Sequence, residues 1–211
     1  IQVTIDTPQF VLASRSPRRK ALLENLGINF NIYPSNIEEV LNDTLTPNKL
    51  VVKLSHQKAS EVAIQFPEKI VIGADTIVVL DGEILGKPVD EKHAVDMLRK
   101  LSGQTHSVFT GVSLIQLSQE AEISFCETTE VTFFKLSEKQ IDSYVRSNPP
   151  LDKAGGYGIQ DWEARFVKSF SGCHDNVVGF PTKKFKEVLT EPRFKESFDV
   201  DNWFGKEWES A

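Results

Sequence analysis

The sequence predicts an α/β protein built on a mixed β-sheet. Apolar runs at 10–13 and 70–80 are typical of buried strands, and segments with helix-like apolar spacing lie between and after them. A hairpin signal at 81–82 places an antiparallel strand in the same sheet. The chain has 211 residues, of which 40% are hydrophobic and 26% charged, so it can form one large domain with a substantial core.

The first elements follow from local signals. The run 10–13 (FVLA) predicts a buried strand. Ser16 suits the N-cap of the next helix, Pro17 suits its first turn, and Gly27 suits its C-terminal end. A second helix begins in the same way at Thr46-Pro47 and continues to about residue 65, followed by a strand.

The middle of the chain favours a longer strand and a hairpin. We expect the strand at 70–80 to be interrupted at 73–76, where Gly-Ala-Asp-Thr breaks the apolar run. The turn at 81–82 returns the chain through 83–85. The later expected elements are a helix at 90–101, strands at 107–117 and 123–136, a helix from the capping box Ser137–Gln140 to about 147, and a final helix at 181–189.

Two segments toward the C-terminus, residues 151–180 and 191–211, do not follow the strand and helix patterns of the rest of the chain. Residues 151–180 are glycine-rich and irregular, and a loop of this length inside a compact domain is typical of a functional segment. We predict one domain over residues 1–190 and a C-terminal extension over residues 191–211. The extension carries five large aromatics, so we expect it to pack on the domain or on a second subunit: Phe194, Phe198, Trp203, Phe204 and Trp208.

Composition excludes several classes of function. A net charge of −6 argues against stable nucleic-acid binding and against anionic membranes, so an anionic ligand must be bound by a local cluster. The two cysteines and four histidines share no zinc-ligand spacing. No apolar run approaches the roughly 20 residues of a membrane-spanning helix, and no signal peptide is recognisable. We expect a soluble cytoplasmic protein.

The first candidate site is the segment Ser14–Lys20, where a strand leads into a helix. Free backbone N–H groups and the helix dipole favour an anion there. Arg18 and Arg19 add forked donors that match phosphate oxygens, and the hydroxyl of Ser14 adds another bond. The alternative interpretation is an ordinary capped helix with solvated arginines.

The second candidate is Asp75 with Thr76. A carboxylate within an apolar strand needs a partner, a metal or a solvent-filled cleft, and Gly73 next to Ala74 leaves room for a ligand. The alternative is a strand-end Asp that pairs with a nearby lysine. Lys87 follows the returning strand of the hairpin, which brings it back toward the level of Asp75.

The third candidate is the segment 153–160 (KAGGYGIQ). Its glycines permit unusual backbone angles and close approach to a flat ligand, and the amide of Gln160 can both donate to and accept from a base edge. A plain glycine turn is the alternative. The segment fits neither the phosphate-loop pattern nor the dinucleotide fingerprint.

Together these blocks resemble the Maf family of nucleoside-triphosphate pyrophosphatases. The matching stretches are LASRSPRRKALLENLG, NIEE, KAS at 58–60, VIGADTIVVLDGEILGKP, MLRKLSGQTHSVFTGV, LDKAGGYGIQ and NVVGFP. The resemblance implies an elongated, inosine-triphosphatase-like domain with two lobes around a central cleft, commonly a homodimer.

The resemblance also implies roles for individual residues, including Lys58 and Glu39, which by themselves read as solvated surface. Asp75 would be the proton acceptor, with Lys58 and Lys87 as catalytic lysines. Glu39 and Asp75 would hold a divalent cation, Mg²⁺ or Mn²⁺. The substrate-binding residues would be Ser14, Arg18, Arg19, Thr76 and Gln160, among which Arg18, Thr76 and Gln160 are tied to substrate choice.

The form KAGGYGIQ resembles the branch that acts on dTTP and UTP rather than on 7-methyl-GTP. Two departures lie beside it. The chain has Asp-Trp-Glu at 161–163, where the family has a small glycine-containing loop, and Gly-Cys-His-Asp at 172–175, where it often has an aromatic residue. Both departures lie near the segment expected to read the base.

The expected reaction is hydrolysis of a nucleoside triphosphate to the monophosphate and pyrophosphate, which would also clear non-standard nucleotides. It needs neutralised phosphate oxygens and an oriented water. Asp75 can accept a proton from that water or can hold the metal that acidifies it. The competing hypothesis is a non-catalytic nucleotide sensor or division-regulating protein with the same cleft, which would gain little from a carboxylate facing phosphates.

Overall fold

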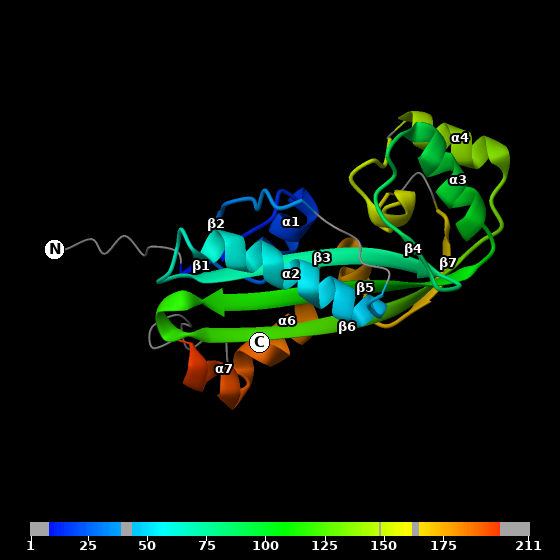
Figure 1. Ribbon diagram of the computed structural model, residues 1–211. Helices are drawn as coiled ribbons and strands as arrows, with labels where there is room; N and C mark the ends of the chain where they lie inside the picture. Colours follow the sequence, from blue (N-terminus) through cyan, green and yellow to red (C-terminus); the bar gives the residue numbers. More distant parts are fainter. Residues whose placement is uncertain (1–8, 39–43, 148, 162–164, 199–211) are drawn as a thin grey trace.

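The structure is a computed structural model that describes residues 9–38, 44–147, 149–161 and 165–198 (Figure 1). One mixed sheet runs the length of the molecule, and helices α3 and α4 gather over one end of it. The sheet has seven strands in the order β2-β1-β3-β5-β6-β7, with β4 pairing to β3. The strands are β1 (Phe10–Leu12), β2 (Phe30–Ile32), β3 (Ile70–Leu80), β4 (Glu83–Leu85), β5 (Thr105–Gln116), β6 (Ala121–Phe133) and β7 (Val167–Ser171).

The helices begin where the capping signals predict. Ser16 accepts a hydrogen bond from the backbone of Arg19, and Asp90 accepts one from the backbone of His93. Within the described ranges, every helix is too short or too polar to cross a bilayer. The helices are α1 (Pro17–Asn25), α2 (Pro47–Ala63), α3 (Glu91–Leu101), α4 (Glu138–Ser147), α5 (His174–Val178), α6 (Thr182–Thr190) and α7 (Pro192–Ser197), with 3-10 turns η1 (Leu117–Gln119) and η2 (Ala154–Gly156).

The sheet buries both faces, because successive strand residues point to opposite sides. On β3, Ile72 packs with α1, α6 and α7, whereas its neighbour Val71 packs with α2. A separate cluster covers the far ends of the long strands, where Val78 and Val131 meet Leu98 of α3. Strands β3, β5 and β6 thus run through two lobes, which confirms the predicted α/β class and the elongated two-lobed form.

Helix α2 lies directly on the sheet because two neighbouring strands have a glycine beneath it. A Cβ added to Gly73 would lie 2.1 Å from the carbonyl oxygen of Ser55, and one added to Gly111 would lie 2.3 Å from that of Val51. No real Cβ tolerates such a distance. The predicted reason for Gly73, space for a ligand, is therefore wrong: the backbone of α2 fills that space.

The expected interruption of the strand at 73–76 is also wrong. Strand β3 is continuous, and Asp75 is paired in register with Gly111 of β5. The break lies instead in β1 and β4, the strands that pair with the other edge of β3. On that edge, β1 pairs with β3 only as far as Ile72, and β4 pairs with β3 only from Val78 onward. Among the described strands, nothing pairs with that edge between these two points, so the backbone edge of β3 is open at Asp75 and Thr76.

Four elements were not predicted: β2, β7, α5 and α7. Strand β2 is short and mostly exposed, so its sequence lacks a strand pattern. The segment 151–180, expected to be irregular, contains β7 and the short helix α5; β7 is mostly exposed at the sheet edge and shows no apolar alternation. Helix α7 follows the helix expected to be last, and it buries Phe194 and Phe198 in the main core. The remaining aromatics of the extension, at 203, 204 and 208, lie outside the described residues.

Substituting Gly73 by alanine should lower the free energy of unfolding by about 2–3 kcal/mol, because the new methyl group overlaps the backbone of α2. The measurement is urea denaturation at constant pH. Gly82→Ala is the matched control, since Gly82 lies in the β3–β4 turn with a positive φ and open space around it. It should cost about 1 kcal/mol from backbone strain alone. Equal costs for the two variants would contradict the close-packing argument.

Candidate active site

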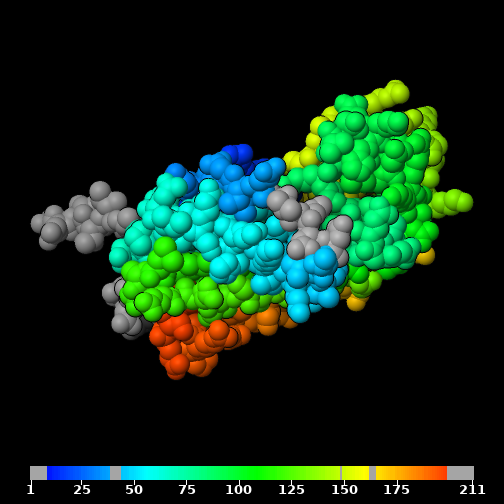
Figure 2. Space-filling view, viewed as in Figure 1, coloured from blue at the N-terminus to red at the C-terminus, as the bar shows by residue number. Residues whose placement is uncertain are grey.

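A cavity of about 490 Å³ opens between the two lobes. In the space-filling view the α3–α4 lobe stands apart from the body that carries α1 and α2 (Figure 2). Every predicted site residue within the described chain lines this cavity: Ser14, Arg18, Arg19, Lys58, Asp75, Thr76, Lys87 and Gln160. Glu39, the predicted second metal ligand, lies outside the described residues.

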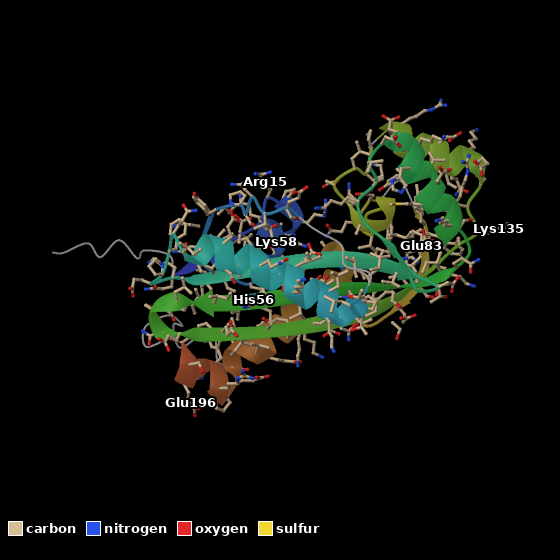
Figure 3. The ribbon with its side chains drawn as sticks, in the orientation of Figure 1. Arg15, His56, Lys58, Glu83, Lys135 and Glu196 are labelled. Atoms are coloured by element: carbon tan, nitrogen blue, oxygen red, sulfur yellow. The ribbon has the colours of Figure 1, made fainter. Side chains whose placement is uncertain are left out.

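The central contact is an ion pair between Lys58 and Asp75. The ammonium of Lys58 donates to Oδ1 of Asp75 at 2.5 Å, and the two residues are 8% and 5% exposed. The pair exists because α2 lies close to the sheet, which places a lysine of the helix above a carboxylate of β3. Figure 3 shows Lys58 on α2 and Arg15 near the start of α1, two cationic residues that line the cavity.

Arg19 is held in place by neutral acceptors. Its Nε donates to the carbonyl of Gly179 at 2.9 Å, Nη1 to the hydroxyl of Ser14 at 3.2 Å, and Nη2 to that of Thr76 at 3.1 Å. The hydroxyl of Thr76 also meets that of Thr110 at 2.9 Å. Arg19 is thus held in a fixed orientation at the cavity wall. These hydrogen bonds connect the segment 14–20, which was predicted to bind an anion, to Thr76 of β3.

Arg18 crosses the cavity to the other lobe. Its Nη1 donates to the carboxylate of Asp152 at 2.6 Å, and Nη2 donates to the backbone carbonyl of the same residue at 3.3 Å. Burial raises the pKa of Asp152, but hydrogen bonding to Arg18 and the charges of Arg18 and Lys153 outweigh it and hold that pKa below its ordinary value. The carboxylate side chain is 56% exposed, so the pair is worth no more than about 1 kcal/mol.

The glycine segment is folded into a rigid wall of the cavity. Gly155 has φ of +70° and donates to the carbonyl of Gly86 at 3.0 Å, which ties the segment to the chain before Lys87. Lys87 itself is exposed at the cavity rim. Beneath this wall the hydroxyl of Tyr157 lies 2.7 Å from Nε2 of buried His106.

The residue after Gln160 anchors the end of the same segment. The hydroxyl of Tyr144 on α4 donates to the carboxylate of Asp161 and accepts from the backbone N–H of Gly158 at 3.2 Å. Burial and the hydrogen bond to Asp161 raise the pKa of Tyr144, so it stays a donor. Asp161 therefore has a structural role here. It holds the backbone that carries Gln160.

The cavity is locally positive in an acidic protein. Among the described residues that line it, six side chains are cationic and three are carboxylates: Arg15, Arg18, Arg19, Lys58, Lys87 and Lys153 against Asp75, Asp152 and Asp161. Within the described ranges, no group of three or more His, Cys, Asp or Glu side chains gathers to hold a metal.

Sequence reasoning missed Asp152, Tyr144 and His106, and it gave Lys153 no role of its own within the segment 153–160. Asp152 and Lys153 lie inside the stretch LDKAGGYGIQ, so their adjacency to the glycines was the available signal. Tyr144 lies on the buried face of α4 and His106 is buried on β5, and neither position indicates which distant segment it contacts. Their contribution depends on the tertiary contacts that bring α4 and β5 to residues 157–161.

The fold and the cavity define an α/β protein with a cation-lined cleft between two lobes. The family model described as Maf-like protein matches residues 9–192 of this chain. The chain therefore belongs to that family. The chain is 46% identical over 180 residues to the dTTP/UTP pyrophosphatase of Carboxydothermus hydrogenoformans, covering 85% of this chain and 96% of that one. It is 49% identical over 189 residues to the dTTP/UTP pyrophosphatase of Bacillus velezensis, covering 90% and 99%.

Among solved structures, the chain resembles the Staphylococcus aureus Ham1 protein with a TM-score of 0.41 and 15% identity, over 59% of this chain and 71% of that one. This likeness is too weak to bear on the fold. The sequence matches, by contrast, cover all described site residues and confirm the resemblance drawn from the motifs.

The buried histidine beneath the cavity makes stability depend on pH. Burial lowers the pKa of His106 from 6.5 to about 4 in the folded protein. Between these values the unfolded chain binds a proton that the native protein excludes, so stability falls as the pH falls through this window. From pH 7 to pH 5 the free energy of unfolding should drop by about 2 kcal/mol on this account.

The measurement is urea denaturation at several pH values, with His106→Phe as the variant that removes the effect. Tyr157→Phe is the control: it deletes the hydrogen-bond partner of His106 but keeps its burial, the cause of the low pKa, so the pH slope should persist. A wild-type slope in His106→Phe would show that other groups account for the acid sensitivity.

Proposed function

We propose that this protein hydrolyses the α–β phosphoanhydride of nucleoside triphosphates of the dTTP and UTP type, giving the nucleoside monophosphate and pyrophosphate. The observation that carries the proposal is the Lys58–Asp75 pair inside a cation-lined cavity. Family membership and the names of the closely matching bacterial relatives support it, since these relatives are dTTP/UTP pyrophosphatases.

The cationic wall at α1 suits the triphosphate. Arg18 and Arg19 lie in the first turn of this helix, where backbone N–H groups and the helix dipole add to their charges. Arg19 presents a guanidinium already oriented by Ser14 and Thr76, so little ordering is lost when an anion binds. Lys87 at the rim adds a further charge for the phosphate chain.

Asp75 is the residue we propose to act on the water. Lys58 holds one carboxylate oxygen, Oδ1, and thereby fixes the orientation of the group. We assign the other oxygen, Oδ2, to the attacking water, either as its proton acceptor or through a cation. A Lys-held carboxylate facing phosphates repels them, which a pure binding protein would not retain. The arrangement therefore favours catalysis over nucleotide sensing.

We propose that the reaction uses Mg²⁺ or Mn²⁺. Mg²⁺ commonly binds one or two carboxylates together with phosphate oxygens and water, and Asp75 supplies one such carboxylate in the cavity. Glu39 is the proposed second ligand. When bound, the cation supplies charge neutralisation at the phosphates. We also propose that the enzyme is a cytoplasmic homodimer and that it clears non-standard nucleotides.

The primary test resolves the products of a panel of nucleoside triphosphates with Mg²⁺ present or removed by chelation. Attack at the α-phosphorus yields monophosphate and pyrophosphate, whereas attack at the γ-phosphorus yields diphosphate and orthophosphate. We expect pyrophosphate, and only with the divalent metal. Orthophosphate as the first product, in preparations free of other pyrophosphatases, would overturn the proposed reaction; no turnover with any nucleotide would favour the sensor.

Replacing Asp75 by asparagine should lower turnover at least ~10²-fold, the usual scale for a lost general base. Asparagine keeps the size of the side chain and an oxygen that can accept from Lys58, while charge and basicity are lost. Steady-state kinetics with UTP measure the effect, and a melting curve checks that the protein is folded. Asp142→Asn on α4, outside the cavity lining, serves as the charge-matched control. Near-normal turnover in a folded Asp75→Asn protein would remove Asp75 from the mechanism.

Base preference should depend on Gln160. Uracil and thymine present an N–H donor flanked by two carbonyl acceptors, and a carboxamide can pair with that edge. We expect UTP and dTTP to exceed ATP and GTP by at least ~10-fold in kcat/KM, or about 1.4 kcal/mol. Gln160→Ala should reduce this ratio more than it reduces kcat. Equal efficiency on all four bases in the wild type would contradict the base-reading role and leave the reaction type intact.

A further inference from the structure

Arg18 forms an ion pair with Asp152, which lies on the opposite lobe. The residue lies in the first turn of α1, and Asp152 immediately precedes the glycine segment on the other side of the cavity. Two nitrogens of the guanidinium, Nη1 and Nη2, both donate to Asp152, to its carboxylate at 2.6 Å and its carbonyl at 3.3 Å. These are the parallel donors that a phosphate group would engage. Asp152 and a bound phosphate therefore compete for one set of donors.

The pair is built so that it can open. Arg18 and Asp152 have side chains that are 25% and 56% exposed, so neither is trapped in an apolar environment when the contact breaks. Asp152 also has a second cation, because Nζ of Lys153 lies 3.3 Å from its other carboxylate oxygen. The carboxylate that Arg18 leaves behind thus keeps a cationic neighbour, which also lies 3.7 Å from Asp161. The buried Asp75 differs, because its ion pair with Lys58 is almost fully enclosed.

We propose that Asp152 is an internal counter-ion that Arg18 exchanges for the phosphates of the ligand and takes back when the polyphosphate product departs. Asp152 is then a positioning residue: it keeps Arg18 extended across the cavity without ligand and weakens the hold on the leaving pyrophosphate. The part concerning pyrophosphate rests on the proposed function; the competition itself holds for any polyphosphate.

The first experiment measures binding of inorganic tripolyphosphate by calorimetry at low ionic strength, with no nucleotide present. Asp152→Asn should bind it about threefold more tightly than wild type, the range expected for removing an exposed ion pair. Asp142→Asn removes one charge outside the cavity lining and should leave the affinity unchanged. Unchanged or weaker binding by Asp152→Asn would overturn the proposal.

A double-mutant cycle separates the pair from general electrostatics. If Asp152 acts through Arg18, the gain in affinity should vanish when Asp152→Asn is made in an Arg18→Gln background. If the gain persists there, Asp152 only repels anions at a distance, and the counter-ion assignment is wrong. Both variants alter partly exposed side chains, and melting curves confirm that the proteins compared are folded.

Product inhibition tests the catalytic consequence. With UTP as substrate, pyrophosphate should inhibit Asp152→Asn at about threefold lower concentration than wild type, because Arg18 no longer has a competing partner. Unchanged inhibition would overturn the role in product release. The tripolyphosphate titration needs no turnover, so its result stands apart from the proposed reaction: tighter binding without pyrophosphatase activity would support the counter-ion and refute the function.

Discussion

The close seating of helix α2 on the sheet is the constraint on which the site depends. Gly73 and Gly111 lie on neighbouring strands and leave no side chain between the sheet and the helix backbone. This contact lets the ammonium of Lys58 reach the carboxylate of Asp75 at 2.5 Å. A larger residue at either glycine would lift the helix, and a lysine lifted away would leave Asp75 buried without its partner, which is costly in a low-dielectric interior.

One side of the cavity arises from strand lengths, and the glycine segment forms the opposite wall. Strand β3 is 11 residues long, whereas β1 and β4, which share one edge of it, are three residues each. The edge between them stays open at Asp75 and Thr76, next to the carboxyl end of β1 and the start of α1. Ligands of open α/β sheets bind in such crevices, where helix N-termini and strand ends converge. Here that geometry gathers cationic side chains in a protein of net charge −6.

The two walls of the cavity differ in how their charges are held. On the wall nearest α1 and α2, Arg19 is fixed by partly buried hydrogen bonds and Lys58 by a buried one. On the opposite wall, Asp152 is exposed, while the glycine segment behind it is anchored by Tyr144 and by the His106–Tyr157 contact. A rigid backbone with one exchangeable ion pair across the gap suits a site that must bind a highly charged ligand and then release it.

Local signals in the sequence determined the helix starts at Ser16 and Asp90, the hairpin at 81–82 and the family, because caps, turns and motifs depend on neighbours a few residues away. Motif resemblance also brought together the described site residues that line one cavity. Only the tertiary structure decided why Gly73 is a glycine, that β3 is continuous through Asp75, and that Arg18 meets Asp152. These features depend on helix–sheet distance, on the lengths of neighbouring strands, and on contacts between residues 134 positions apart. Sequence spacing does not encode such contacts, since packing of distant segments sets them.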